Sequence, residues 1–273
     1  MIKKIISKIK RIFRRKKIVK AEISYLQPEC RLKGKKIIVT GGGRGLGASM
    51  AEKFVKEGAS VLISGRNESV LKSTADRIGC QYLTLDVTDV SSFDSFINKS
   101  EEMLGEITTL VNNAGISLHE KTFFDVTPDT FDAQINTNMK GAYFLTQKVI
   151  KFWQEKETKG VVLFISSETG DMMDFRPYGF TKVAVNSMVQ GLAYLFAKNQ
   201  IRINAVAPGV TVSDMTGQRE DDNIAHSRNM LGRVYLPEEV AETACFLLSD
   251  AAGCISGQII TCNNAKSINA RWK

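Results

Sequence analysis

The sequence contains little of what a metalloprotein, a disulfide-stabilised protein or a membrane-spanning protein needs. Its 273 residues include two histidines and five cysteines, and the cysteines form no Cys-x-x-Cys pair. This pattern argues against a zinc site and a disulfide framework and fits a reducing cytoplasm. No apolar run approaches the roughly 18 residues that a spanning helix requires. We therefore expect a cytoplasmic protein without a metal, whose 43% hydrophobic residues suffice for a full core.

Acidic residues are absent from the first 20 positions, which hold ten lysines and arginines. The rest of the chain carries 27 basic and 29 acidic residues, so the net charge of +8 comes from this arm. At about 100° per residue, a helix over 1–15 would separate an apolar side from a basic side. The apolar side holds Ile2, Ile5, Ile6, Ile9, Ile12 and Phe13, and the basic side Lys3, Lys4, Lys8, Lys10, Arg11, Arg14 and Arg15.

A basic amphipathic helix with one apolar stripe is typical of an interfacial membrane anchor, because anionic headgroups attract its charged side. The arm thus favours peripheral attachment to the inner face of an anionic membrane. Three alternatives remain open: a solvated tail, a contact with an acidic protein or partner subunit, and nucleic acid. Nucleic acid ranks last, since electrostatic tails need no apolar stripe. Residues 21–33 resemble a linker, and 34–273 form the expected folded domain.

From Lys35 onward, short β-rich runs alternate with helical stretches. The expected strands are 35–40, 60–64, 81–85, 107–111, 161–166, 201–206 and 258–261. The expected helices are 46–57, 67–77, 90–103, 127–155, 180–198 and 237–249. Apolar strands that alternate with helices predict a parallel sheet covered on both faces. The fold class is α/β: a doubly wound, seven-stranded parallel sheet in a single Rossmann-type domain.

The first expected strand runs into "TGGGRGLG" and then into a helix. Gly41, Gly45 and Gly47 permit a tight turn and a close backbone approach to a pyrophosphate, which the helix N-terminus stabilises. At the end of the second strand, where NAD-binding folds often place an acid, the sequence has Arg66. Arg66 and Arg44 suit a 2′-phosphate, so the pattern favours NADP(H) over NAD(H).

The stretch "YGFTK" places Tyr178 four residues before Lys182. On a helix these positions share a face, so the ammonium can lie near the phenol. A neighbouring cation favours the ionised phenol, which makes the group a useful proton donor or acceptor near neutrality. Two polar residues on a solvated helix face would show the same spacing.

Seven motifs follow one another in an order that resembles the classical short-chain dehydrogenases/reductases over about residues 35–262. They are "TGGGRGLG", "LDVTD", "NNAG", "NTNMKG", "ISS", "YGFTK" and "NAVAPG". The overall pattern is most similar to the 3-oxoacyl-(acyl-carrier-protein) reductase branch. The resemblance indicates that the tyrosine and lysine of "YGFTK" are a catalytic pair rather than two polar residues on a solvated helix face.

The resemblance implies four catalytic residues. Tyr178 would protonate the substrate carbonyl oxygen as hydride arrives from the nicotinamide. Lys182 would lower the pKa of the phenol and bind the nicotinamide ribose. Ser167, preferred over its neighbour Ser166, would hydrogen-bond the substrate oxygen, and Asn138 would hold a water that links Lys182 to a proton relay.

The resemblance also implies a set of cofactor contacts. Asp86 and Val87 would flank the adenine, and Asn113 its ribose. Thr211 and Ser213 would reach the nicotinamide amide and the diphosphate. The complete expected set is Gly41, Gly43, Arg44, Gly45, Leu46, Gly47, Arg66, Asp86, Val87, Asn113, Ala114, Gly115, Tyr178, Lys182, Pro208, Gly209, Thr211 and Ser213.

Two departures from the family pattern concern the substrate and the assembly. The stretch between Ser167 and Tyr178 is shorter than in most relatives, and this region commonly shapes the substrate pocket. Near the end, "CNNA" stands where relatives usually read Asp-Gly-Gly, in a region that often packs at subunit contacts. By resemblance we expect a homodimer or homotetramer.

The expected function is an NADPH-dependent carbonyl reductase or alcohol dehydrogenase that acts on a small molecule, such as a 3-oxoacyl thioester. An alternative is a membrane-associated reductase of a sugar or polyol intermediate in cell-surface polysaccharide synthesis. A third hypothesis, of a different class, is a non-catalytic cofactor-binding scaffold. Nucleic acid is not an expected partner.

Overall fold

The computed structural model describes residues 30–213, 215–217 and 223–268. The basic arm at 1–20 and most of the expected linker lie outside these residues. The described part contains one sheet of seven parallel strands in the order β3-β2-β1-β4-β5-β6-β7. The strands are β1 (Lys36–Thr40), β2 (Ser60–Gly65), β3 (Gln81–Thr84), β4 (Thr109–Asn112), β5 (Val161–Ile165), β6 (Arg202–Pro208) and β7 (Ile259–Cys262). The doubly wound α/β prediction is confirmed.

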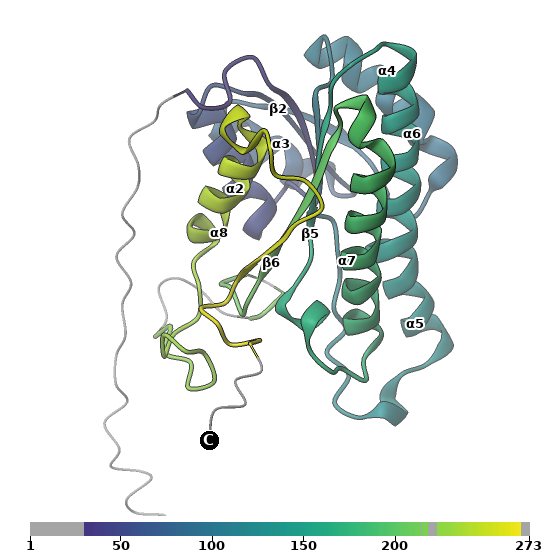
Figure 1. Cartoon of the computed structure of the whole chain (residues 1–273). Coiled ribbons are helices and arrows are strands. Elements are labelled where there is room, and N and C mark those ends of the chain that lie inside the picture. The colour runs from purple at the N-terminus through teal and green to yellow at the C-terminus, as the bar shows by residue number, and fades with distance from the viewer. Residues whose placement is uncertain (1–29, 214, 218–222, 269–273) are drawn as a thin grey trace, which may run out of the picture.

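Helices cover both faces of this sheet (Figure 1). One layer contains α2 (Gly45–Lys56), α3 (Glu68–Ile78) and α8 (Pro237–Leu248). The other contains α4 (Phe93–Leu104), α6 (Ala142–Glu155) and α7 (Pro177–Phe196), with α5 (Pro128–Ile135) just before α6. Among the described residues, none of these helices is long and apolar enough to cross a membrane.

The central strands are buried on both sides, as a parallel sheet between two helix layers requires. In β1, Ile38 faces the cluster under α4, α6 and α7, while Ile37 and Val39 face the cluster under α2 and α8. This alternation follows from the two-residue period of a strand. Apolar residues therefore run continuously along the strands, as the sequence predicts.

The last residues of the expected linker belong to the folded domain. Leu32 is fully buried in the α2/α8 cluster. The Arg31 guanidinium pairs with Glu57 at 2.6 Å and with Glu242 at 3.1 Å. Arg31 and Leu32 thus pack against the sheet domain.

Two helix boundaries differ from the sequence prediction. The stretch 127–155, expected as one helix, is interrupted by a π-helical segment, Asn136–Gly141. At Gly141 a Cβ atom would lie 2.2 Å from the carbonyl oxygen of Val87, so the backbones approach closely there. The expected 180–198 helix begins at Pro177, in the first helical turn, where proline is favoured. This earlier start places Tyr178 and Lys182 on one helix.

Candidate active site

A cavity of about 490 Å³ opens at the carboxyl ends of the strands. It spans the β1/β4 neighbourhood, where the strand order reverses and open α/β sheets bind their ligands. Its lining residues come from the carboxyl ends of β2, β5 and β6, from the segments after β1 to β6, from α2 and α7, and from the π-helical segment Asn136–Gly141. They are Gly41, Arg44, Gly45, Leu46, Gly47, Ser64, Gly65, Arg66, Leu85, Asp86, Val87, Asn113, Ala114, Gly115, Ile116, Ser117, Leu118, Thr137, Ile165, Ser166, Ser167, Tyr178, Lys182, Pro208, Gly209, Thr211, Ser213, Met215 and Thr216.

The glycine turn after β1 is fixed from the next strand of the sheet. The Asn113 side-chain amide donates to the carbonyl oxygens of Thr40 at 2.9 Å and Gly41 at 3.0 Å. Gly41 and Gly45 have φ angles of 65° and 53°, the left-handed region that favours glycine. At Gly47 a Cβ atom would lie 2.3 Å from the Gly41 oxygen. The turn therefore offers bare backbone at a helix N-terminus, which suits a phosphate group.

Charged side chains flank this turn at the ends of β2 and β3. Arg44 and Arg66 are exposed and line the cavity together with Asp86. Burial acts to raise the pKa of Asp86, but hydrogen bonds from the Thr88 amide and hydroxyl and the charge of Arg66 hold it below its usual value. Asp86 is thus a carboxylate, which accepts from Thr88 at 2.9 and 2.8 Å.

Two adjacent serines at the end of β5 are held differently. The Ser166 hydroxyl donates to the Asn186 side chain at 2.6 Å. The Ser167 hydroxyl oxygen accepts from the Thr169 amide at 3.2 Å, as the cap of a short 3₁₀ turn, Glu168–Asp171. The Ser167 proton is therefore directed to the cavity, where it can be donated to the Tyr178 phenol or to a substrate oxygen. This geometry favours Ser167 over Ser166 as the donor to a substrate oxygen.

Tyr178 and Lys182 lie one turn apart on α7, beside Ser167. The Lys182 ammonium lies 5.4 Å from the centre of the Tyr178 ring and donates to the carbonyl oxygen of Ile165 at 2.8 Å. Lys182 is buried, with 6% of its surface exposed. The phenol, the ammonium and the Ser167 hydroxyl thus share one wall of the cavity.

Burial dominates the ionisation of this pair. Desolvation raises the pKa of Tyr178, although its interaction with Ser167 and the charge of Arg176 act in the opposite direction. Desolvation also lowers the pKa of Lys182 to about 8. The expected lowering of the Tyr178 pKa by Lys182 is therefore not found in this structure. Desolvation is the largest cause of both pKa shifts.

Asn138 lies behind the cavity rather than on its wall. Its side chain holds the Ile116 backbone from both sides, accepting from the amide and donating to the carbonyl, each at 2.8 Å. It also donates to the Thr181 hydroxyl at 3.3 Å. It sits in the π-helical segment, a distortion that is frequent at functional sites. Asn138 thereby joins the turn after β4 to α7.

The structure brings nearly all predicted site residues to this one cavity. The exceptions are Asn138 and Gly43, which packs toward Val70 and Leu71 of α3 and accepts a hydrogen bond from Thr74. Eleven lining residues were not predicted from the sequence. Ser64, Gly65, Leu85, Ile116, Ser117, Leu118, Ile165 and Ser166 lie at or just beyond strand ends, where the rule for α/β sheets would have found them. Thr137, Met215 and Thr216 carry no such signal.

Known proteins resemble the chain over most of its length. The family model described as enoyl-(acyl carrier protein) reductase matches residues 41–264. An NADP(+)-dependent L-rhamnose 1-dehydrogenase from Thermoplasma acidophilum is 32% identical over 87% of this chain and 98% of its own. A 3-oxoacyl-[acyl-carrier-protein] reductase from Thermotoga maritima is 34% identical over 84% of this chain and 96% of its own.

A solved structure shows the same likeness in three dimensions. The 3-ketoacyl-(acyl-carrier-protein) reductase from Brucella melitensis, crystallised with NADH, has a TM-score of 0.80 and 30% identity. The match covers 87% of this chain and all of that one. With the family model, these relatives show that the chain belongs to the short-chain dehydrogenase/reductase family and is an oxidoreductase of alcohol or carbonyl groups.

Proposed function

We propose that the protein is an NADP-dependent carbonyl reductase, or alcohol dehydrogenase, with Tyr178 as its general acid. One observation carries this proposal: Ser167, Tyr178 and Lys182 share a wall of the cavity whose far end is lined by Arg44 and Arg66. A proton donor and a cation at one end, with phosphate-binding groups at the other, match the two halves of a reductase site.

The residues present fit a dinucleotide. The glycine turn would hold the pyrophosphate through its backbone amides at the start of α2, and a Cβ atom at Gly41 or Gly47 would lie within 3 Å of protein atoms and distort the turn. Arg66 would hold a 2′-phosphate, in agreement with the NADP named for the rhamnose dehydrogenase relative. Asp86 and Val87 would flank the adenine, and Thr211 the nicotinamide. A bound nicotinamide supplies or accepts the hydride.

The remaining chemistry belongs to the chain's own side chains. Negative charge develops on the carbonyl oxygen during reduction, and a hydrogen-bond donor and a proton at close range stabilise it. Ser167 would donate the hydrogen bond and Tyr178 the proton. Lys182 would stabilise the resulting phenolate with its buried charge and bind the ribose. Asn138 would support Lys182 through the relay that the family resemblance implies.

The relatives act on several substrate classes, and two of these correspond to the expected function and its alternative. A 3-oxoacyl thioester is favoured by the Thermotoga and Brucella proteins. A sugar or polyol is favoured by the rhamnose dehydrogenase. We place the thioester first, because the apolar residues Ile116, Leu118 and Met215 line the cavity.

Oxidation of NADPH, followed by absorbance, tests the function and separates the substrates. We expect turnover with acetoacetyl-CoA and none with crotonyl-CoA, which offers a carbon–carbon double bond instead of a ketone. Oxidation of L-rhamnose with NADP⁺ would instead favour the sugar class. Tight NADPH binding without turnover of any carbonyl compound would favour the scaffold hypothesis.

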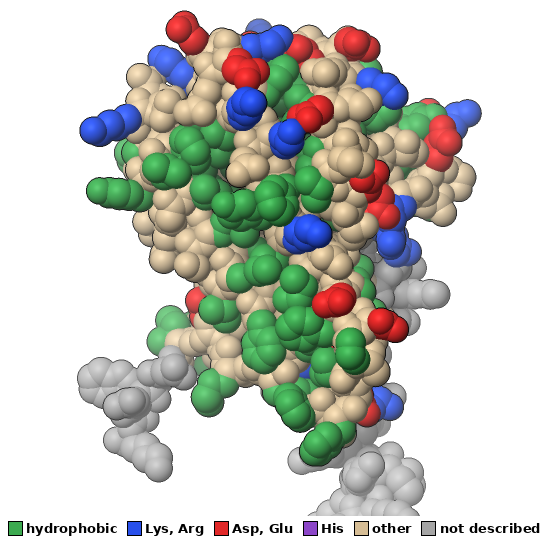
Figure 2. Space-filling model, turned by 90° about the vertical axis from the view of Figure 1, so that its right-hand side faces the viewer, with side chains coloured by type: hydrophobic (Ala, Val, Ile, Leu, Met, Phe, Trp, Pro, Cys, Tyr) green, Lys and Arg blue, Asp and Glu red, His purple; other side chains and the backbone are tan. Residues whose placement is uncertain are grey.

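We also propose self-association through the helical side that lies to the right in Figure 1. Figure 2 shows hydrophobic side chains gathered across this side. On α6 and α7 the exposed apolar residues are Tyr143, Phe180, Val183, Tyr194 and Leu195. Contiguous exposed apolar surface of this kind marks interaction sites. Sedimentation velocity is expected to show a dimer or tetramer, and Tyr194→Lys to weaken it.

Peripheral membrane attachment through residues 1–15 stays a prediction from the sequence. Vesicles that contain phosphatidylserine test it by sedimentation with the full chain and with a chain that lacks residues 1–20. We expect the full chain to sediment with the vesicles and the shortened chain to stay in solution. Equal sedimentation of the two chains would contradict the prediction.

A further inference from the structure

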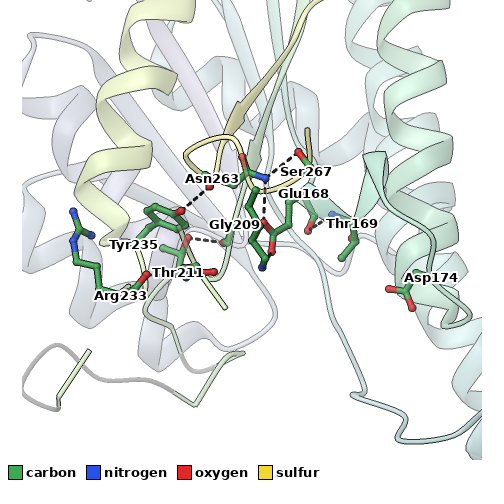
Figure 3. A network of polar contacts seen from close by, with 12 residues as sticks. Glu168, Thr169, Asp174, Gly209, Thr211, Arg233, Tyr235, Asn263 and Ser267 are labelled. Carbon is green, nitrogen blue, oxygen red and sulfur yellow. Dashed lines mark hydrogen bonds and ion pairs between the residues drawn. The ribbon is translucent and has the colours of Figure 1, made fainter. Parts of the chain in front are cut away.

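A buried carboxylate lies directly beside the catalytic serine proposed above. Glu168 follows Ser167, and 7% of its side chain is exposed. Its side chain does not line the cavity but points to the chain segment after β7 (Figure 3). There it pairs with the Lys266 ammonium and accepts from the Asn263 side chain at 3.1 Å. A buried charge needs such partners, because an isolated one would be costly.

The same segment also reaches the cofactor side of the cavity. The Tyr235 hydroxyl donates to the Asn263 carbonyl at 2.7 Å, and the Gly209 amide donates to the Cys262 carbonyl at 3.0 Å. At Gly209 a Cβ atom would lie 2.7 Å from the Tyr235 ring and 3.2 Å from the Glu168 carboxylate. Glu168 and Asn263 therefore connect the serine turn to the loop after β6, which carries Thr211.

A second contact holds the other end of the serine turn. Asp171, the last residue of the 3₁₀ turn, accepts from Asn186 at 3.2 Å and from Thr261 of β7 at 3.4 Å. The turn Glu168–Asp171 is thus held at both ends by groups that include the C-terminal chain. Its interior is held by Ser167, which accepts from the Thr169 amide.

The backbone just before Lys266 has an unusual conformation. Asn264 and Ala265 have φ angles of 51° and 67°. Asparagine tolerates this left-handed region, whereas alanine rarely adopts it. Such strain persists only where the surroundings impose it, and it occurs preferentially at functional sites. The residues on either side of this pair, Asn263 and Lys266, both contact Glu168.

We propose that Glu168 is a positioning residue, and that its pair with Lys266 lets the C-terminal segment 262–268 fix the Ser167 hydroxyl against the cofactor loop. Its effect on reduction rests on the proposed function, while its effect on the serine turn does not. The segment that departs from the family's usual Asp-Gly-Gly sequence thereby gains a role inside its own subunit.

Two variants of the full chain test this role: Lys266→Met, and a double variant that combines it with Glu168→Gln. Lys266→Met leaves a buried carboxylate without its cation, so we expect the serine turn to loosen. The glutamine that replaces Glu168 in the double variant carries no charge and can still accept from Asn263, so the turn should be held again. The matched control is Glu57→Gln, which breaks a buried ion pair with Arg31 and Lys53 away from the cavity.

Hydrogen–deuterium exchange of peptides that cover 166–176 measures how firmly the serine turn is held, and it needs no ligand. Lys266→Met is expected to accelerate exchange there at least tenfold, and the double variant to restore it; Glu57→Gln should leave it unchanged. Unchanged exchange in Lys266→Met, or no recovery in the double variant, would overturn the proposal.

Kinetics with NADPH and acetoacetyl-CoA provide the second measurement. Lys266→Met is expected to lower kcat by about ten- to a hundredfold through misplacement of Ser167, with the KM for NADPH within about twofold. An equal loss of kcat in Glu57→Gln would show that the Glu168–Lys266 pair acts only through general stability, which would contradict the proposal. If the unaltered protein neither binds NADPH nor reduces the thioester, the proposed function fails and the exchange result alone decides the role of Glu168.

Discussion

The two ends of the cavity differ in which protein groups form them, backbone at one end and side chains at the other. The end near β1 and β2 consists largely of backbone: a glycine turn, held by Asn113, at the start of α2. The end near β5 and α7 consists of polar and ionisable side chains, with Lys182 buried and Tyr178 partly buried. A backbone cradle binds a phosphate without buried charges, whereas acid catalysis requires groups whose ionisation is disturbed. We expect added side-chain atoms in the glycine turn to weaken cofactor binding, and the loss of an ionisable group at the second end to weaken catalysis.

The largest expected effect concerns the proton donor. Tyr178→Phe keeps the ring but removes the hydroxyl, and general acid catalysis contributes about 10²–10⁴-fold. We expect the reduction rate to fall by about a thousandfold, with NADPH affinity within about threefold of the original. Single-turnover absorbance measurements check the rate, and a loss of less than tenfold would assign proton donation to another group.

The second prediction concerns the cost of the buried ammonium. Burial lowers the pKa of Lys182 to about 8, so above that pH the unfolded chain holds more protons than the folded one. The contribution of this group to stability therefore rises from pH 8 to about 10.4, the ordinary pKa of lysine, and is least favourable at pH 7. Lys182→Met should remove activity yet raise the free energy of unfolding at pH 7 by up to about 3 kcal/mol.

Urea unfolding at pH 7 and pH 10 measures this difference. The gain from Lys182→Met should shrink at pH 10, where the unaltered protein holds Lys182 neutral. A variant that is equally or less stable at pH 7 would show that Lys182 contributes more through its bond to Ile165 than its burial costs.

The third prediction adds a methyl group to the glycine turn and tests whether cofactor binding is lost. In Gly47→Ala, the new methyl group would meet the Gly41 carbonyl oxygen, so the turn must shift. We expect NADPH affinity to fall by about a hundredfold. Gly191→Ala is the control, because a Cβ atom there meets open space on α7. This control should leave binding unchanged and stabilise the helix by about 0.5–1 kcal/mol. Equal binding by the two variants, measured by fluorescence titration, would contradict the account.

Some features of the fold and of the cavity could be predicted from the sequence, and others could not. The strand pattern and the glycine turn were sufficient for the sheet and the backbone end, because both follow from local spacing. The π-helical break at Asn136–Gly141 could not be predicted, since it depends on the contact between Gly141 and the turn after β3. Glu168 was also missed, because its partner Lys266 lies 98 residues further along the chain.

The titration of the full chain with NADPH and NADH, for the unaltered protein and for Arg66→Ala, tests the central claim most directly. A guanidinium on a 2′-phosphate forms charge-assisted hydrogen bonds that NADH cannot replace. The account predicts at least about tenfold tighter binding of NADPH, most of which Arg66→Ala removes while NADH binding stays within about twofold. Equal affinity for the two nucleotides, or an equal loss of both in Arg66→Ala, would contradict it.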